Sequence, residues 1–176
     1  QRGGGGGGEA NLETLARQGQ WDRCHEEASK MGADTAAKYS VLHAKREAQA
    51  GNFEVAAQVL SKYGAPINPA NFELYKTIAA ETLAGQQDGF GEEECKEFLY
   101  RLVVAMGATP EVNKQWLADF KRYHEASHYA CVRARTKDTK QPELSAKAAT
   151  ALLRYIGEIP ADRAFFEAGE RGEEVA

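Results

Sequence analysis

The stretch LARQGQWDRC, residues Leu15–Cys24, decides the fold because it recurs later in the chain. It aligns without a gap with EAQAGNFEVA, residues Glu47–Ala56, which places Gly19 on Gly51, 32 positions later. Glycine tolerates the left-handed backbone conformation that commonly ends a helix. The two stretches therefore predict the turns of two helical hairpins that follow each other along the chain.

The residues after each glycine repeat at the same offset. Trp21 aligns with Phe53, and Cys24 aligns with Ala56. An aromatic side chain can fill the wedge between two helices, and a small side chain allows the helices to approach closely. We expect Trp21 and Phe53 to be largely buried at equivalent places in successive hairpins, and Gly51 to adopt the left-handed conformation.

The repeat length favours an α-solenoid of tetratricopeptide-like helical hairpins. Tetratricopeptide repeats have a period of about 34 residues, and each hairpin needs its neighbours to cover its apolar face. The fold class is therefore predicted as all-α. The alternative is an ordinary helical bundle in which two hairpins resemble each other by coincidence.

Helix signals continue through the chain. Asn68-Pro69 and Thr109-Pro110 each place a capping side chain before a proline of the first helical turn. Apolar residues then recur at steps of three and four, as expected for a buried helical stripe. The first stripe consists of Phe72, Tyr75, Ile78 and Ala79, and the second of Val112, Trp116, Phe120, Tyr123, Ser127, Ala130 and Ala134.

Two further helices are expected towards the C-terminus. Pro142 opens the first, Gly157 and Pro160 interrupt it, and a short final helix holds Phe165 and Phe166. The face of the first consists of Leu144, Ala148, Ala151, Leu152 and Tyr155. No segment alternates apolar and polar residues as a half-buried strand does, so we expect no sheet.

Glycine-rich segments set the predicted domain boundaries. The six glycines Gly3–Gly8 have no side chain to pack, so residues 1–9 are predicted as a flexible linker. Residues 10–176 are predicted as one solenoid segment. We expect it to be a fragment of a longer chain, because it starts at Gln1 without a methionine. The segment GQQDGFG, residues 85–91, is expected to be an exposed loop.

Composition argues against several classes of function. The net charge of -4 and the isoelectric point near 5.7 do not suit the broad basic surface that binds duplex nucleic acid. No apolar run approaches the roughly 20 residues of a membrane span. Cys24, Cys95 and Cys131 are widely spaced, which argues against a zinc or redox CxxC pair and favours a reducing, cytosolic environment.

HEASH, residues His124–His128, has the HExxH pattern of zinc peptidases, in which two histidines hold the metal and the glutamate activates water. The extended metzincin pattern needs a glycine and a histidine further on, where this chain has Cys131 and Ala134. A ligand on the following helix, Glu143 or Glu158, would be needed instead. Nothing in the sequence selects either residue.

We interpret His124 and His128 as structural residues. They lie on the flank of the stripe centred near Trp116 and Tyr123, where partly buried histidines can form hydrogen bonds between helices. A peptidase cleft also usually lies beside a strand, and no strand is predicted. The sequence therefore predicts no enzyme, no catalytic residue, no metal ligand and no cofactor.

Three groups of charged residues have competing explanations. The acidic run 92–94 suits the start of a helix and the basic run 133–140 suits a helix end, so we expect both to be solvated, although either could dock a partner. Lys38, Lys45 and Arg46 are the only candidates for a clamp around a peptide's terminal carboxylate, and this clamp looks incomplete.

Three stretches carry a resemblance to a known family. They are LARQGQWDRC from Leu15, KYGAPINPANFELYK from Lys62, and LLRYIGEIPADRAFFEAG from Leu152. Together they resemble the C-terminal helical-repeat region of the family of the largest peripheral subunit of intraflagellar transport complex B, over residues 9–172. The most specific part is GAPINPANF, residues 64–72, because generic repeats do not require that spacing of proline and asparagine.

The resemblance implies a non-enzymatic protein–protein interaction scaffold that takes part in the assembly of cilia and flagella and in the turnaround of transport trains. It implies other intraflagellar transport proteins as partners, from complex B and complex A. It also implies a location in the cilium or flagellum and in the cytoplasm at the basal body. The alternatives are a tetratricopeptide-type module that binds peptides or co-chaperones and, more remotely, the zinc peptidase. The sequence selects no interface residue.

Overall fold

The computed structural model describes residues 5–84, 91–109, 113–137 and 141–152, and every regular element in these ranges is a helix. The all-α prediction is therefore confirmed for the described residues. The helices are α1 (Gly5–Arg17), α2 (Trp21–Met31), α3 (Ala33–Gln49), α4 (Phe53–Tyr63), the short 3-10 helix η1 (Pro69–Asn71), α5 (Phe72–Ala84), α6 (Glu92–Gly107), α7 (Lys114–Lys137) and α8 (Pro142–Leu152).

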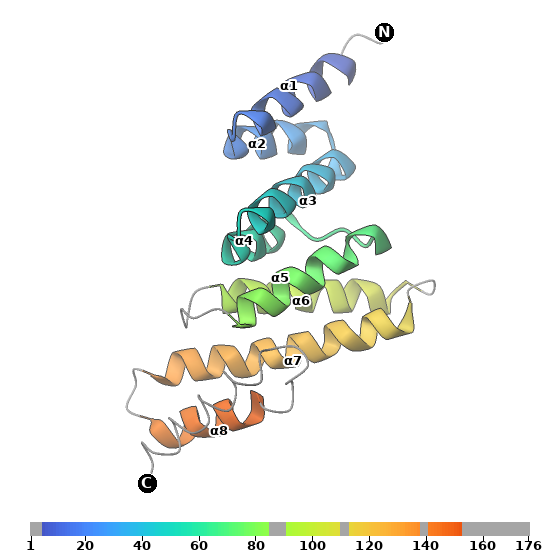
Figure 1. The fold of residues 1–176 in the computed structure, drawn as a ribbon. Helices are drawn as coiled ribbons and strands as arrows, with labels where there is room; N and C mark the ends of the chain where they lie inside the picture. The colour runs from blue at the N-terminus through green and yellow to red at the C-terminus, as the bar shows by residue number, and fades with distance from the viewer. Residues whose placement is uncertain (1–4, 85–90, 110–112, 138–140, 153–176) are drawn as a thin grey trace.

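The helices follow one another in layers from α1 at one end of the molecule to α8 at the other (Figure 1). Helices in extensive contact are neighbours in the chain or are separated by a single α-helix, as in the α4–α6 and α5–α7 pairs. Among the described helices, those far apart in sequence therefore share no extensive contact. The core is a continuous series of contacts between successive helices.

The turns at Gly19 and Gly51 are the same structure. Their φ angles are 72° and 82°, both in the left-handed region. In each turn the glycine N–H bonds the carbonyl three residues back, and the next N–H bonds the carbonyl five residues back. This pair of bonds is the Schellman motif that ends a helix at a glycine. The predicted conformation of Gly51 is confirmed.

The positions after each turn are also equivalent. Trp21 begins α2 and Phe53 begins α4, while Cys24 and Ala56 are both fully buried. Trp21 and Phe53 are each half-buried, so the expectation that they are largely buried is only partly met. A residue at the first position of a helix lies at the rim of the hairpin, where part of its side chain faces solvent.

The segment that joins α4 to α5 is held by three hydrogen bonds. Ser40 Oγ donates to the carbonyl of Gly64 at 2.7 Å, and the hydroxyl of Tyr75 donates to the carbonyl of Pro66 at 2.8 Å. The Asn68 side chain accepts from the N–H of Ala70 at 3.1 Å, as predicted for a cap. Asn68-Pro69 therefore opens a 3-10 turn that runs directly into α5.

Helix α1 differs from the predicted linker of residues 1–9. It begins at Gly5, inside the glycine run, and an added Cβ at Gly8 would lie 3.1 Å from the Met31 side chain. Each glycine costs about 1 kcal/mol of helix stability relative to alanine. The helix extends there because its later turns are anchored by buried Leu12 and Leu15. The linker stays a prediction for residues 1–4, which lie outside the described residues.

The C-terminal helices agree with the sequence in part. Helix α7 ends in the predicted basic segment, and Phe120, Tyr123 and Ser127 of its stripe are buried. In α8, Ala148 is buried but Leu144 is 44% exposed, so the predicted apolar face is wrong at Leu144. That residue lies in the first turn of its helix. Several predicted positions lie outside the described residues: Pro110, Val112, Tyr155, Gly157, Pro160, Phe165, Phe166 and residues 85–90.

Two apolar clusters contain most of the buried apolar side chains of the described residues. The first cluster lies in α1, α2 and α3 and contains Leu12, Leu15, Ala16, Cys24, Ala28 and Tyr39. The second cluster runs from α3 to α7 and is rich in aromatic residues. Within it, the Phe72 ring of α5 lies 5.6 Å from both Trp116 and Phe120 of α7, which joins these two helices.

Gly91 precedes α6 and offers a test of close packing. Its φ is +90°, and an added Cβ would lie 2.8 Å from Cβ of Glu54 and 3.1 Å from Cγ2 of Thr82. Gly51 has a similar φ of +82° with nothing within 4 Å of its added Cβ. We expect Gly91→Ala to lower the free energy of unfolding by about 3 kcal/mol, because both strain and overlap act there. Gly51→Ala should lower it by about 1 kcal/mol, from backbone strain alone.

Urea denaturation of the two variants measures the difference. Equal losses would show that the contacts of Gly91 with α4 and α5 add nothing to the backbone strain.

Candidate functional site

Two histidines lie buried where α2, α3 and α4 meet. His25 is 3% exposed and His43 is 9% exposed. Nε2 of His25 lies 2.9 Å from Nδ1 of His43, and Nε2 of His43 lies 3.5 Å from the Glu47 carboxylate. Because the carboxylate only accepts, Nε2 of His43 carries the proton and its Nδ1 accepts from His25. We name this pair the histidine seam.

Aromatic rings enclose the histidine seam on both sides. The His43 ring stacks on Trp21 with centroids 4.1 Å apart, and the His25 ring stacks on Tyr63 at 3.7 Å. The guanidinium of Arg46 lies 5.4 Å above the Trp21 ring. Trp21 packs with the first apolar cluster and Tyr63 with the second. The histidine seam therefore places polar contacts between the two apolar clusters.

Both imidazoles are neutral at pH 7. Burial, with a smaller contribution from the neighbouring His43, lowers the pKa of His25 to about 4. Burial also lowers the pKa of His43, although the Glu47 carboxylate acts in the opposite direction. The more distant charges have smaller effects: Asp22 raises the pKa of both rings, Lys62 lowers that of His25, and Arg46 lowers that of His43.

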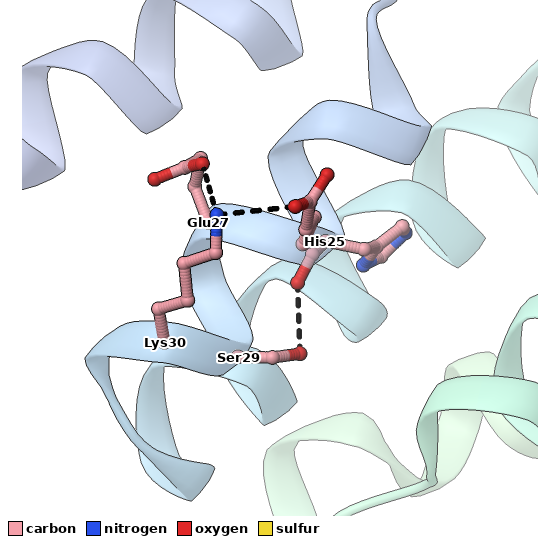
Figure 2. Close-up of polar contacts among 5 residues, drawn as sticks. His25, Glu27, Ser29 and Lys30 are labelled. Atoms are coloured by element: carbon pink, nitrogen blue, oxygen red, sulfur yellow. Dashed lines mark hydrogen bonds and ion pairs between the residues drawn. The ribbon is translucent and has the colours of Figure 1, made fainter.

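The ion pairs of helix α2 lie on the side of the helix that faces away from the histidine seam. Lys30 Nζ lies 2.8 Å from the Glu27 carboxylate. Figure 2 shows this pair on one side of the helix, while the His25 ring points away from it. Lys30 also pairs with Glu26 at 3.1 Å, and Ser29 donates to the His25 carbonyl at 2.8 Å. Exposed pairs of this kind contribute little to stability, because solvent screens them. They make the outer face of α2 polar.

The HExxH histidines lie on the surface of α7. His124 is half-buried with its ring 5.8 Å from Tyr100 of α6, and His128 is exposed beside Tyr129. Burial, followed by Lys96 and His128, lowers the pKa of His124. The contact of His124 with the neighbouring helix is a ring contact, whereas we expected a hydrogen bond.

The proposed third zinc ligands do not complete a site within the described residues. These residues contain no group of three His, Cys, Asp or Glu side chains that could hold a metal ion. Glu143 lies in the first turn of α8, and Glu158 lies outside the described residues. The absence of a metal, cofactor or catalytic residue stays a prediction.

The acidic and basic runs meet across α6 and α7. Glu93 forms an ion pair with Arg135, whereas both runs were expected to be solvated. Glu92 is 3% exposed and Arg133 is 2% exposed, so solvation is wrong for these two side chains. Burial follows because the start of α6 lies beside the end of α7. The side chains of residues 137–140 lie outside the described residues.

The three cations of the peptide clamp do not gather in one groove. Lys38 lines a groove of about 370 Å³ with Asp34 and Asn71, and it pairs with Glu9 at 3.3 Å. Arg46 instead covers Trp21 and donates to the carbonyl of Ala16. Lys45 is exposed and does not line the groove. This arrangement does not favour the hypothesis of a module that binds peptides or co-chaperones.

Sequence reasoning missed the histidine seam. His25 and His43 are 18 positions apart and match no motif, and their partner Tyr63 comes from a third helix. The repeat alignment could have indicated this place, since Trp21 marks the junction of the two hairpins. No described helix is long and apolar enough to cross a membrane.

The described residues define an all-helical protein built from successive helical hairpins. No protein-family model matches the chain. The chain is 34% identical over 164 residues to intraflagellar transport protein 172 of Chlamydomonas reinhardtii. The aligned region covers 90% of this chain and 9% of that protein. It is 31% identical over 172 residues to the Mus musculus homologue, covering 94% and 10%, and 32% identical over 165 residues to the Drosophila melanogaster homologue, covering 90% and 9%.

The chain thus belongs to the intraflagellar transport protein 172 family, as the counterpart of one segment. It spans about a tenth of the length of the relatives it matches. The family resemblance predicted from the sequence is confirmed.

The histidine seam should make stability depend on pH. In the unfolded chain the imidazoles bind protons near pH 6.5, whereas the folded state keeps them neutral. The unfolded state therefore binds more protons, and stability falls as the pH drops below 6.5. We expect His25 to account for a loss of about 2 to 3 kcal/mol, which levels off below about pH 4.

Urea denaturation of the wild type and of His25→Phe between pH 7.5 and 4 separates this effect from the titration of carboxylates. The variant should lose less stability over that interval. Parallel curves for the two proteins would show that His25 is not the titrating group.

The placement of the HExxH histidines predicts weak metal binding at most. Protein purified without chelator should contain much less than one equivalent of zinc, and His128→Ala should not change that content. Elemental analysis by mass spectrometry measures it. Stoichiometric zinc that disappears in His128→Ala would restore the peptidase hypothesis.

Proposed function

We propose that this chain is a tetratricopeptide-like α-solenoid segment that serves as a protein–protein interaction scaffold in intraflagellar transport. The observation that carries the proposal is similarity to intraflagellar transport protein 172 over nine-tenths of the chain. The stacked hairpins support it, because arrays of this kind expose extended surfaces. The scaffold has no catalytic activity.

The segment belongs to the C-terminal helical-repeat region of the parent protein. Its partners are other intraflagellar transport proteins, namely its complex B neighbours and complex A, and its work is train assembly and turnaround during the building of cilia. It acts in the cilium or flagellum and in the cytoplasm at the basal body, and it binds no nucleic acid. The repeated Schellman turns support the solenoid, since identical turns repeat the geometry from hairpin to hairpin.

Crosslinking mass spectrometry on intact transport trains tests this function. Exposed lysines such as Lys45 and Lys121 should form crosslinks to other intraflagellar transport proteins. The expected result is that intermolecular crosslinks recur at defined positions of this segment. Crosslinks confined to the segment itself, in trains whose other subunits do crosslink to one another, would contradict a scaffold role.

A further inference from the structure

Helices α6 and α7 present a surface with two exposed apolar side chains next to partly buried ones. Four large apolar side chains are exposed among the described residues: Met31, Tyr100, Val104 and Leu144. Tyr100 is 56% exposed and Val104 is 55% exposed, and they lie one turn apart on α6. Met31 and Leu144 belong to other helices. Adjacent exposed apolar residues of this size are typical of interaction sites.

The patch extends onto α7. The Tyr100 ring lies 5.8 Å from the His124 ring, which places the two helix faces side by side. Half-buried Leu117 is seven residues before His124 and therefore lies on the same face of α7. We name the set Tyr100, Val104, Leu117 and His124 the α6–α7 patch.

The rim of the α6–α7 patch is positively charged. Lys96 lies one turn before Tyr100 and is close enough to His124 to affect its ionisation. Lys121 lies one turn after Leu117, and Lys114 lies about one turn before it. None of these three lysines forms an ion pair with the described residues.

The nearby carboxylates of α6 are already engaged. Glu97 pairs with Arg101 at 2.7 Å, and Glu93 pairs with Arg135. Arg101 also donates to the carbonyl of Ser61 at 2.9 Å, which fixes its side chain towards α4. Lys96, Lys114 and Lys121 therefore supply the cations that these carboxylates leave for a partner, and Glu125 of α7 is the carboxylate that acts on His124 beside them.

We infer that the α6–α7 patch docks an acidic amphipathic helix of another protein in the transport train. Apolar side chains of that helix, three or four positions apart, would cover Tyr100 and Val104, and its flanking carboxylates would meet Lys96 and Lys121. The inference rests on the proposed scaffold function and names the chemistry of one partner. A neutral His124 suits the apolar centre, since it adds no charge there.

A photo-crosslinking amino acid tests the contact directly. Tyr100 is replaced by p-benzoylphenylalanine in the full-length protein, trains are isolated and irradiated, and the crosslinked peptide is sequenced. Gln49, exposed on α3, receives the same substitution as a control. We expect position 100 to capture one defined peptide of another subunit, with at least two carboxylates at helical spacing, and position 49 not to capture it.

Charge reversal provides the matched test of the rim. Lys121→Glu should reduce the crosslink from position 100 about tenfold, as expected when an interface residue of moderate importance is lost. Lys45→Glu, which reverses an equally exposed lysine on α3, should leave it unchanged. Unchanged urea midpoints for both variants show that folding is intact.

Each other outcome overturns the inference. These outcomes are equal capture at positions 49 and 100, a captured peptide without carboxylates, a second copy of this chain, a crosslink within the same chain, or capture of lipid. Loss of the crosslink in Lys45→Glu as well as in Lys121→Glu also overturns it. Failure of the scaffold function is distinguished by the lysine crosslinks of the same trains. If position 100 captures no other subunit while exposed lysines of this segment still crosslink to other subunits, only this inference fails; if the lysines form no such crosslinks either, the scaffold function fails as well.

Discussion

The fold depends on the fact that a helical hairpin has more apolar surface than its two helices can cover for each other. The Schellman turns at Gly19 and Gly51 fix each hairpin, with fully buried Cys24 and Ala56 allowing the following helix to pack closely. What remains uncovered must be covered by the next hairpin. This constraint explains why the extensive contacts of each described α-helix are with helices adjacent or one further along, and why the core is a series of contacts.

The histidine seam interrupts this series with polar groups. Buried polar groups stabilise a fold only when they are paired, because an unpaired group has lost its hydration. His25 and His43 bond each other, yet Nδ1 of His25 has no hydrogen-bond partner among the described residues. In the tautomer set by Glu47 this atom is an acceptor. Stacking on Trp21 and Tyr63 keeps both rings in place. The relative orientation of α2, α3 and α4 at the histidine seam therefore depends on the stacking of these rings as well as on apolar burial.

Most local signals in the sequence agree with the structure, the glycine run at the start of α1 being the exception, whereas signals that depend on tertiary packing do not. The turn glycines, the Asn68 cap and the stripe of α7 follow from backbone preferences and helical periodicity, which any single segment carries. The burial of Glu92 and Arg133 depends on which helix ends lie side by side. The α6–α7 patch was also missed, since exposure of Tyr100 and Val104 cannot be told from burial without knowing what covers α6.

The segment between α4 and α5 has a mechanical consequence. Its backbone is non-helical over residues 64–68, but hydrogen bonds from Ser40 of α3 to Gly64 and from Tyr75 of α5 to Pro66 attach it to these two helices. A connection fastened in this way transmits torque, whereas a free linker would let the two halves swivel independently. If force bends the stacked helices, the bending would then be spread over many small shifts between neighbouring helices.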